Sequence, residues 1–139
     1  GQEGYAHRIA RAIVNARRAK KLETTKDLAE IIAGVKPKKS KIHPATKCFQ
    51  ALRIAVNDEL NNLKKALPQA LALLKPKGRL VVISFHSGED RIAKQFFKEK
   101  ALTKQVQILT KKPIRPTKTE IEKNPHSRSA KLRAVEKNK

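Results

Sequence analysis

One stretch near the middle of the chain, residues 75–90 (KPKGRLVVISFHSGED), constrains the fold more than any other. Pro and Gly mark a turn at residues 75–78, and the turn leads into the apolar run 79–85, which is rich in β-branched residues. A continuous apolar run of this length predicts a strand that is buried on both faces of a parallel sheet. The chain is therefore expected to contain an α/β sheet.

A helix signal follows this strand directly. Ser87 and Asp90 have the spacing of a capping box, which predicts a helix over residues 89–100. His86 and Ser87 then fall at the carboxyl end of the strand, where open α/β sheets place their ligand crevice. Ser87 has a second interpretation, as a helix cap without any ligand, and both interpretations remain open at this point.

Helical patterns dominate the part of the chain before this strand. Apolar stripes predict helices over residues 5–20 and 24–34, and Thr24 with Asp27 forms a second capping-box pattern. A third segment has its apolar residues at helical spacing: Phe49, Leu52, Val56, Leu60, Leu63 and Leu67. Pro68 is expected to kink or restart this helix, because proline lacks the backbone N–H.

After the central strand and helix, the pattern becomes weaker. Residues 105–109 and 129–135 alternate enough to predict two further strands, and a basic loop, a short helix at 119–123 and a turn at 124–127 lie between them. Three strands are too few for a doubly wound sheet. We therefore expect the back half of an α/β domain, preceded by an all-helical piece, with the first half missing.

The charge of the chain points to a polyanionic partner. Its 139 residues include 33 Lys and Arg against 12 Asp and Glu, a net charge of +21. A charge of this size favours nucleic acid first and an anionic membrane surface second. No apolar run approaches the roughly 20 residues that span a bilayer, and no signal peptide is visible. The single Cys48 suits a reducing compartment, so we expect a cytoplasmic protein without a membrane partner.

Four basic clusters, at residues 17–21, 36–41, 111–118 and 128–133, suggest where phosphates would bind. One cluster alone is often only a solvated surface, but four together favour phosphate contacts. The residues expected to contact RNA phosphate are Arg17, Arg18, Lys36, Lys38, Lys39 and Lys41. Aromatic residues are few, so shape and backbone recognition are favoured over base stacking.

The sequence contains no recognisable metal-binding or cofactor-binding motif. The one Cys and four His residues have no ligand spacing, so no metal site is expected. The five glycines are scattered and form no phosphate-cradling turn, so no cofactor-binding residue is expected in this chain.

Three segments together resemble one family. They are HPATKCFQALRIAVNDEL (43–60), LLKPKGRLVVISFHSGEDRIAKQFF (73–97) and NPHSRSAKLRAVEK (124–137). These segments are similar to the ribosomal RNA small subunit methyltransferase H family, as is the opening GQEGYAHRIARAIVNAR. The resemblance covers nearly the whole chain.

The resemblance implies an S-adenosylmethionine-dependent enzyme that methylates N4 of a cytidine in the decoding region of small-subunit ribosomal RNA. It implies a Rossmann-like methyltransferase domain interrupted by a helical insertion that helps recognise RNA. Residues 1–54 then correspond to that insertion, and residues 55–139 to the carboxyl-terminal half of the Rossmann-like sheet. The cofactor loop lies in the half that is missing, so this fragment alone is expected to be inactive.

Two departures from the family pattern affect local geometry. Lys77 stands where the family has Gly, which favours a type I turn that ends at Gly78. Gly88 stands where the family has Leu, which weakens the start of the following helix by about 1 kcal/mol.

The catalytic residues are not evident from the sequence. The residues expected to line the crevice or hold RNA are His43, Arg53, Asn57, His86, Ser87, Arg128 and Ser129. The alternative to an enzyme is a non-enzymatic protein that binds ribosomal RNA, or a catalytically dead relative. The segment SFHS followed by a capped helix favours the enzyme, because a pure phosphate binder does not need it.

Overall fold

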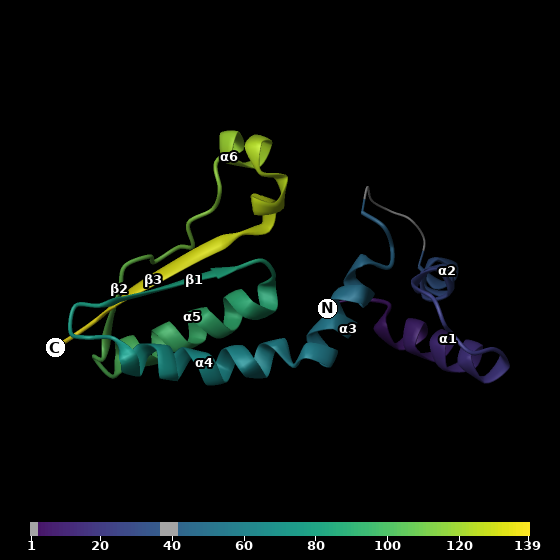
Figure 1. Cartoon of the computed structure of the whole chain (residues 1–139), viewed down its shortest axis with the longest axis horizontal. Helices are drawn as coiled ribbons and strands as arrows, with labels where there is room; N and C mark the ends of the chain where they lie inside the picture. The colour runs from purple at the N-terminus through teal and green to yellow at the C-terminus, as the bar shows by residue number, and fades with distance from the viewer. Residues whose placement is uncertain (1–2, 37–41) are drawn as a thin grey trace. The chain divides into compact units, whose positions relative to one another are not determined.

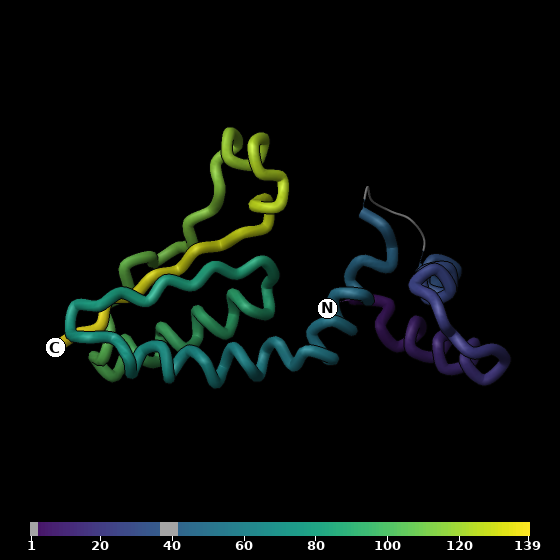
Figure 2. Tube along the Cα trace, viewed as in Figure 1, coloured from purple at the N-terminus to yellow at the C-terminus, as the bar shows by residue number. Residues whose placement is uncertain are grey.

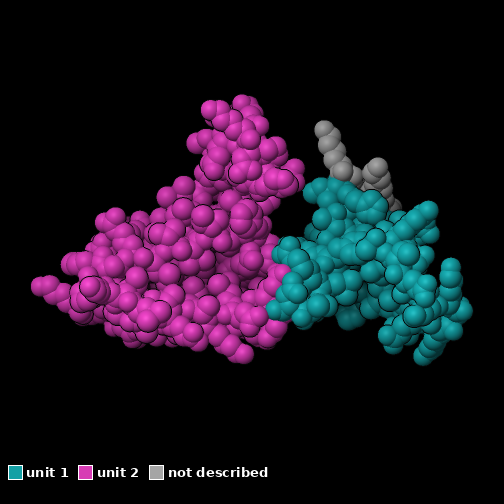
Figure 3. Space-filling view, viewed as in Figure 1, with its two compact units in different colours: residues 1–57 teal, residues 58–139 magenta. Residues whose placement is uncertain are grey.

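The computed structural model describes residues 3–36 and 42–139. The chain forms two compact units, unit 1 (residues 1–57) and unit 2 (residues 58–139) (Figure 3). Each unit has its own hydrophobic core. The division falls between Asn57 and Asp58, whereas the sequence predicts a boundary after residue 54. The roles assigned to the two parts from the resemblance stay predictions.

Unit 1 contains three helices: α1 (Ala6–Ala19), α2 (Thr25–Val35) and α3 (Thr46–Asn57). The predicted capping box at the start of α2 is confirmed, because the Thr24 hydroxyl accepts from the Asp27 N–H at 3.1 Å and the Asp27 carboxylate accepts from the Thr24 N–H at 2.9 Å. The buried core of unit 1 consists of Ile9, Ile32 and Ala45.

The long helix expected after residue 43 is divided into α3 and α4 (Glu59–Leu73). The helices separate at Asp58, which has a left-handed backbone conformation with φ 50°. The expected restart at Pro68 is wrong, since α4 continues through Pro68, whereas the alternative, a kink, stays a prediction. Pro68 is exposed, and there water can replace the missing backbone hydrogen bond. The apolar stripe is also not one core face, because Val56 is 83% exposed while Leu67 is buried.

The sheet of unit 2 has three strands: β1 (Arg79–Ser84), β2 (Val106–Ile108) and β3 (Lys131–Lys137). Their order is β1-β3-β2, and both outer strands run antiparallel to β3 (Figure 1). Strands were expected at all three places, but β1 is an edge strand with an antiparallel neighbour rather than a strand within a parallel sheet.

Helices α4 and α5 (Ser87–Leu102) lie along the same face of the sheet (Figures 1 and 2). Leu71, Phe97, Val106 and Val135 form the buried core between these helices and the strands. The opposite face of β1 is open, with Val81 50% and Ile83 56% exposed. The prediction that this strand is buried on both faces is therefore wrong for this chain, because helices cover only one face.

The remaining elements complete unit 2. Helix α6 (Lys118–Lys123) confirms the predicted short helix, and the expected turn after it is the 3-10 helix η1 (Pro125–Ser129). No helix among the described residues is long and apolar enough to cross a membrane.

The turn before β1 differs from its predicted type. Gly78 N–H donates to the Lys75 carbonyl at 2.9 Å, which closes the turn, but Lys77 has φ 66°. A positive φ at this third position, after Pro76, is the geometry of a type II turn rather than type I. Lys77 thus occupies a position that favours glycine, and a Cβ on Gly78 would lie 2.8 Å from the Lys75 carbonyl oxygen.

Candidate functional site at one end of the sheet

The connection from β1 to α5 is built around the ring of His86. His86 is the N-cap of α5, and its Nδ1 accepts from the N–H of Gly88 at 3.1 Å and of Glu89 at 3.3 Å. Helix α5 begins at Ser87, two residues earlier than predicted, and the capping box joins His86 to Glu89 rather than Ser87 to Asp90. Ser and Asp are common capping residues, and for this reason the predicted cap lies one residue later than the observed cap.

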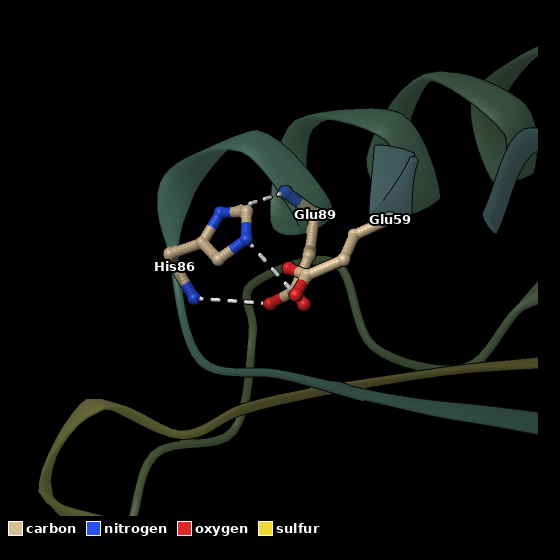
Figure 4. Close-up of side chains that lie close together, drawn as sticks. All are labelled: Glu59, His86 and Glu89. Carbon is tan, nitrogen blue, oxygen red and sulfur yellow. Dashed lines mark hydrogen bonds and ion pairs between the residues drawn. The ribbon is translucent and has the colours of Figure 1, made fainter. Parts of the chain in front are cut away.

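Glu89 completes this cap from the other side. One carboxylate oxygen accepts from the N–H groups of Phe85 at 2.9 Å and His86 at 3.2 Å, and the other lies 3.4 Å from His86 Nε2. Glu59, in the first turn of α4, lies beside them, and one ligand atom from each of the three residues lies within 4.8 Å of the others (Figure 4). The end of β1 and the starts of α4 and α5 therefore meet at this cluster.

The hydrogen bonds at His86 decide what the cluster can bind. Because Nδ1 accepts two backbone hydrogen bonds, the neutral ring carries its proton on Nε2; this tautomer is assigned from the hydrogen-bond network. Nε2 is buried without a hydrogen-bond partner and faces the carboxylates of Glu59 and Glu89. A metal ion requires a ring nitrogen without a proton, so this arrangement does not fit a metal ligand set.

Gly88 permits this position of the ring. A Cβ at residue 88 would lie 3.1 Å from two ring atoms of His86 and 3.4 Å from a methyl carbon of Leu60. Such contacts are tighter than ordinary packing distances. A side chain at residue 88 would therefore press on the ring that caps α5.

Asp90 connects the first turn of α5 to β3. Its carboxylate accepts from Arg133 Nε at 2.8 Å and Nη2 at 3.3 Å, and Lys131 Nζ lies 3.6 Å away. The Arg133 guanidinium holds the pKa of the Asp90 carboxyl below its usual value, despite the opposing effect of burial. This nearly buried pair fixes the helix start against the sheet.

The start of β3 lies at the same end of the sheet. Ser84, the last residue of β1, is opposite Lys131, the first residue of β3, and the Ser84 hydroxyl donates to the Lys131 carbonyl at 3.4 Å. Helix η1 immediately precedes β3. As a result, parts of all three segments that carry the family resemblance, 43–60, 73–97 and 124–137, meet at this end of unit 2.

Four of the predicted site residues belong to this end of the sheet. His86 is largely buried and serves as a cap, whereas Ser87 is exposed in the first turn of α5. Arg128 and Ser129 are exposed in η1, just before β3. Their roles as crevice or RNA-contacting residues stay predictions.

The other three predicted site residues belong to unit 1. His43 Nδ1 accepts from the Ala45 N–H at 3.2 Å, so the His43 ring takes part in the turn that precedes α3. Arg53 is exposed on α3, and Asn57 is its last residue.

The residues predicted to contact RNA phosphate have different surroundings. Arg17 and Arg18 are exposed in the last turn of α1. The Lys36 ammonium donates to the Glu3 carboxylate and, at 3.2 Å, to the Pro44 carbonyl. The hydrogen bond from Lys36 to Glu3 holds the pKa of the Glu3 carboxyl below its usual value. Lys36 therefore stabilises unit 1 internally, and its role as a phosphate contact stays a prediction.

The remaining three of these lysines, Lys38, Lys39 and Lys41, lie outside the described residues.

Sequence reasoning missed Glu59 and Glu89 as members of this cluster. Glu89 had a detectable signal, since a Glu three residues after a possible cap is a capping-box pattern once His86 is allowed as the cap. Glu59 had no such signal, because only the packing of α4 beside α5 brings it to His86.

Residues 3–36 and 42–139 do not form a glycine-rich binding turn for S-adenosylmethionine. A nucleoside cofactor bound in the usual way needs a glycine-rich turn after a strand, with close backbone approach. Among the described glycines none has a positive φ, and the turn from β1 to α5 is filled by the ring of His86. No cofactor-dependent step is therefore derived from these residues.

These observations describe a mixed α/β protein whose motif residues gather at one end of a small sheet. A family model described as the MraW methylase family matches residues 1–138, and the chain belongs to this family.

Relatives named Ribosomal RNA small subunit methyltransferase H share about half of its residues. The protein from Persephonella marina is 51% identical over 140 residues, which cover 99% of this chain and 48% of the relative. The protein from Coprothermobacter proteolyticus is 53% identical over 137 residues, which cover 99% of this chain and 46% of the relative. The chain thus spans about half the length of these curated relatives, and the resemblance predicted from its motifs is confirmed.

Proposed function

We propose that this chain is part of a cytoplasmic enzyme that transfers a methyl group from S-adenosylmethionine to N4 of a cytidine in the decoding region of small-subunit ribosomal RNA. The observation that supports this most strongly is the match over 99% of the chain to relatives named as ribosomal RNA methyltransferases. The meeting of the motif segments at one end of the sheet supports the same proposal.

Within this proposal, the chain supplies one part of a Rossmann-like domain. The free edge of β1 and its open apolar face, with Val81, Ile83 and Phe85 each at least half exposed, would be covered by the half of the relatives' length that this chain does not match. That half would also supply the cofactor site. Residues 1–54 would form the helical insertion that helps recognise RNA.

The end of the sheet that carries His86, Ser87, Arg128 and Ser129 would then border the crevice for the base. An exocyclic base nitrogen can reach such a crevice only when the base is unstacked. The exposed Arg128 and Ser129 would contact RNA, and the exposed Ser87 would border the same crevice. His86 and Glu89 would hold the start of α5 in place.

A fusion protein tests the proposal. The part of the Persephonella marina relative that this chain does not match, which the resemblance predicts to be its first half, would be joined upstream of this chain. Transfer of labelled methyl from S-adenosylmethionine to small ribosomal subunits would then be measured. Digestion of the RNA to nucleosides should then yield labelled N4-methylcytidine. The chain alone and the added half alone serve as controls, and both should be inactive.

The fusion also distinguishes the alternative functions. A fusion that binds the cofactor and the subunit without transferring methyl would indicate a catalytically dead relative. A chain that binds ribosomal RNA tightly, but whose fusion neither binds cofactor nor transfers methyl, would indicate a non-enzymatic RNA-binding protein.

A further inference from the structure

A groove of about 290 Å³ lies in unit 2 beside β2, on the opposite edge of the sheet from β1. Its exposed rim carries Lys94 and Lys98 from α5 and Lys111 from the loop after β2. Lys94 lies one turn of α5 beyond Asp90, so the groove begins where the ion pairs at the helix start end. It is therefore a feature separate from the His86 cluster.

The charges on this rim are not compensated within the described part of the chain. No carboxylate there forms an ion pair with Lys94, Lys98 or Lys111, whereas Arg133 at the base of the groove is paired with Asp90. Lys94 and Lys98 are four residues apart on one helix, where like charges repel each other and destabilise the helix. An anion in the groove would remove this repulsion.

The base of the groove suits a sugar-phosphate chain better than a base. Phe97 is only 3% exposed, so its ring is not open for stacking, and together with Ile108 it offers an apolar wall. The Thr110 hydroxyl accepts from the Ala134 N–H at 2.9 Å, which leaves its own hydrogen available to a bound oxygen. The Arg133 guanidinium is held in place by Asp90 and adds a fixed positive charge.

We propose that this groove binds the phosphate backbone of RNA through Lys94, Lys98 and Lys111, without reading the base sequence. The choice of RNA as the polyanion rests on the proposed function. The groove would act as an RNA contact in unit 2, in addition to the basic residues of unit 1. Its contribution would be electrostatic, through release of counterions from the phosphates.

The test compares two triple variants of the 139-residue chain with the same change in charge. The groove variant carries Lys94→Gln, Lys98→Gln and Lys111→Gln. The control variant carries Lys64→Gln, Lys65→Gln and Lys75→Gln, which are exposed lysines of the same unit outside the groove. Binding to a small-subunit ribosomal RNA fragment and to an unrelated RNA would be titrated across salt concentrations.

The groove variant should bind both RNAs at least about tenfold more weakly at 0.1 M salt, and its slope of log affinity against log salt should fall by about 3, roughly 1 for each lost phosphate contact. The control variant should change the slope by less than about 1. Equal losses in the two variants would overturn the proposal, and so would a loss confined to one RNA sequence.

Lysine footprinting of the unaltered chain keeps the proposal testable even if the groove variant folds poorly. RNA should protect Lys94, Lys98 and Lys111 from acetylation, while Lys64 and Lys65 stay reactive. Protection of all five to the same extent would overturn the proposal. Neither measurement depends on methyl transfer, so an inactive fusion protein together with a protected groove would reject only the proposed function.

Discussion

The ion pair between Asp90 and Arg133 offers a sharp test of how α5 is held to the sheet. Replacing Asp90 by Asn keeps the size of the side chain but removes its charge. The Arg133 guanidinium would then remain largely buried, with only 10% of its side chain exposed, and without a compensating carboxylate.

The expected loss is large for a single substitution. Breaking a buried ion pair by removing one partner costs about 3–5 kcal/mol. The Asp90 side chain keeps 15% exposure, so some solvent screening remains and we expect a loss of about 3 kcal/mol in the free energy of unfolding of unit 2. A double variant, Asp90→Asn with Arg133→Met, should recover part of this loss because no charge stays buried and unpaired.

The pH dependence follows from the same pair. The pKa of Asp90 is lowered in the folded chain, first of all by its hydrogen bond with Arg133. A lowered folded-state pKa contributes stability that is present above the unfolded value of about 3.9 and is lost as the pH falls through the folded value. The unaltered chain should therefore lose stability below about pH 4, and Asp90→Asn should show a weaker dependence in that range.

Urea unfolding followed by circular dichroism, at several pH values from 7 to 3, measures both effects. Asp58→Asn is the matched control, because Asp58 is exposed and Asn tolerates its left-handed backbone. The control should stay within about 0.5 kcal/mol of the unaltered chain. A similarly small change for Asp90→Asn, or an unchanged acid transition, would refute the role assigned to the pair.

Three further outcomes are expected. Lys77→Gly should be more stable than Lys77→Ala by about 1 kcal/mol in urea unfolding, because φ is 66° at this turn position; equal stability would contradict the type II geometry. Leu71→Ala should cost about 2–5 kcal/mol, whereas Val56→Ala, at a position 83% exposed, should cost less than about 0.5 kcal/mol in thermal or urea unfolding. Calorimetry should show no binding of S-adenosylmethionine to this chain alone, and tight binding would mean that the described residues form a cofactor site after all.

Local features of this fold could be predicted well from the sequence. The capping box of Thr24 and Asp27 is complete within four residues, so its pattern specifies the start of α2 without help from the rest of the chain. The short helix α6 and the three strands were likewise visible from local patterns. The family was identified because its motifs are long and occur in a consistent order.

Features that depend on distant partners could not be predicted. The apolar residues of β1 have the pattern of a strand that is buried on both faces. Whether the second face is buried depends on which other segments pack against it, and the local sequence does not specify this. The break between α3 and α4 at Asp58 contains no Gly or Pro, so no sequence signal predicts it. Pro68 is a residue type that normally ends a helix, yet it is tolerated on an exposed side of α4.

The candidate site shows the same division. The strand and helix pattern predicts a candidate site at the end of β1. The same pattern does not predict which side chains contact one another there. His86 is an unusual N-cap, and Glu59 reaches it only because α4 packs beside α5. The basic groove likewise combines Lys94 and Lys98 with Lys111, and these residues come together only when β2 packs against α5.

One edge of β1 has no strand beside it in the described part of the chain, and this affects how the protein behaves in solution. An edge strand with exposed Val81 and Ile83 and no proline is a template for pairing with another copy. The charge of +21 opposes such pairing by repulsion between copies. The range of that repulsion shrinks from about 10 Å at 0.1 M salt to about 3 Å at 1 M. Preparations should therefore stay monodisperse in dilute buffer and self-associate as salt is added. For many basic proteins the opposite holds, and added salt reduces non-specific association.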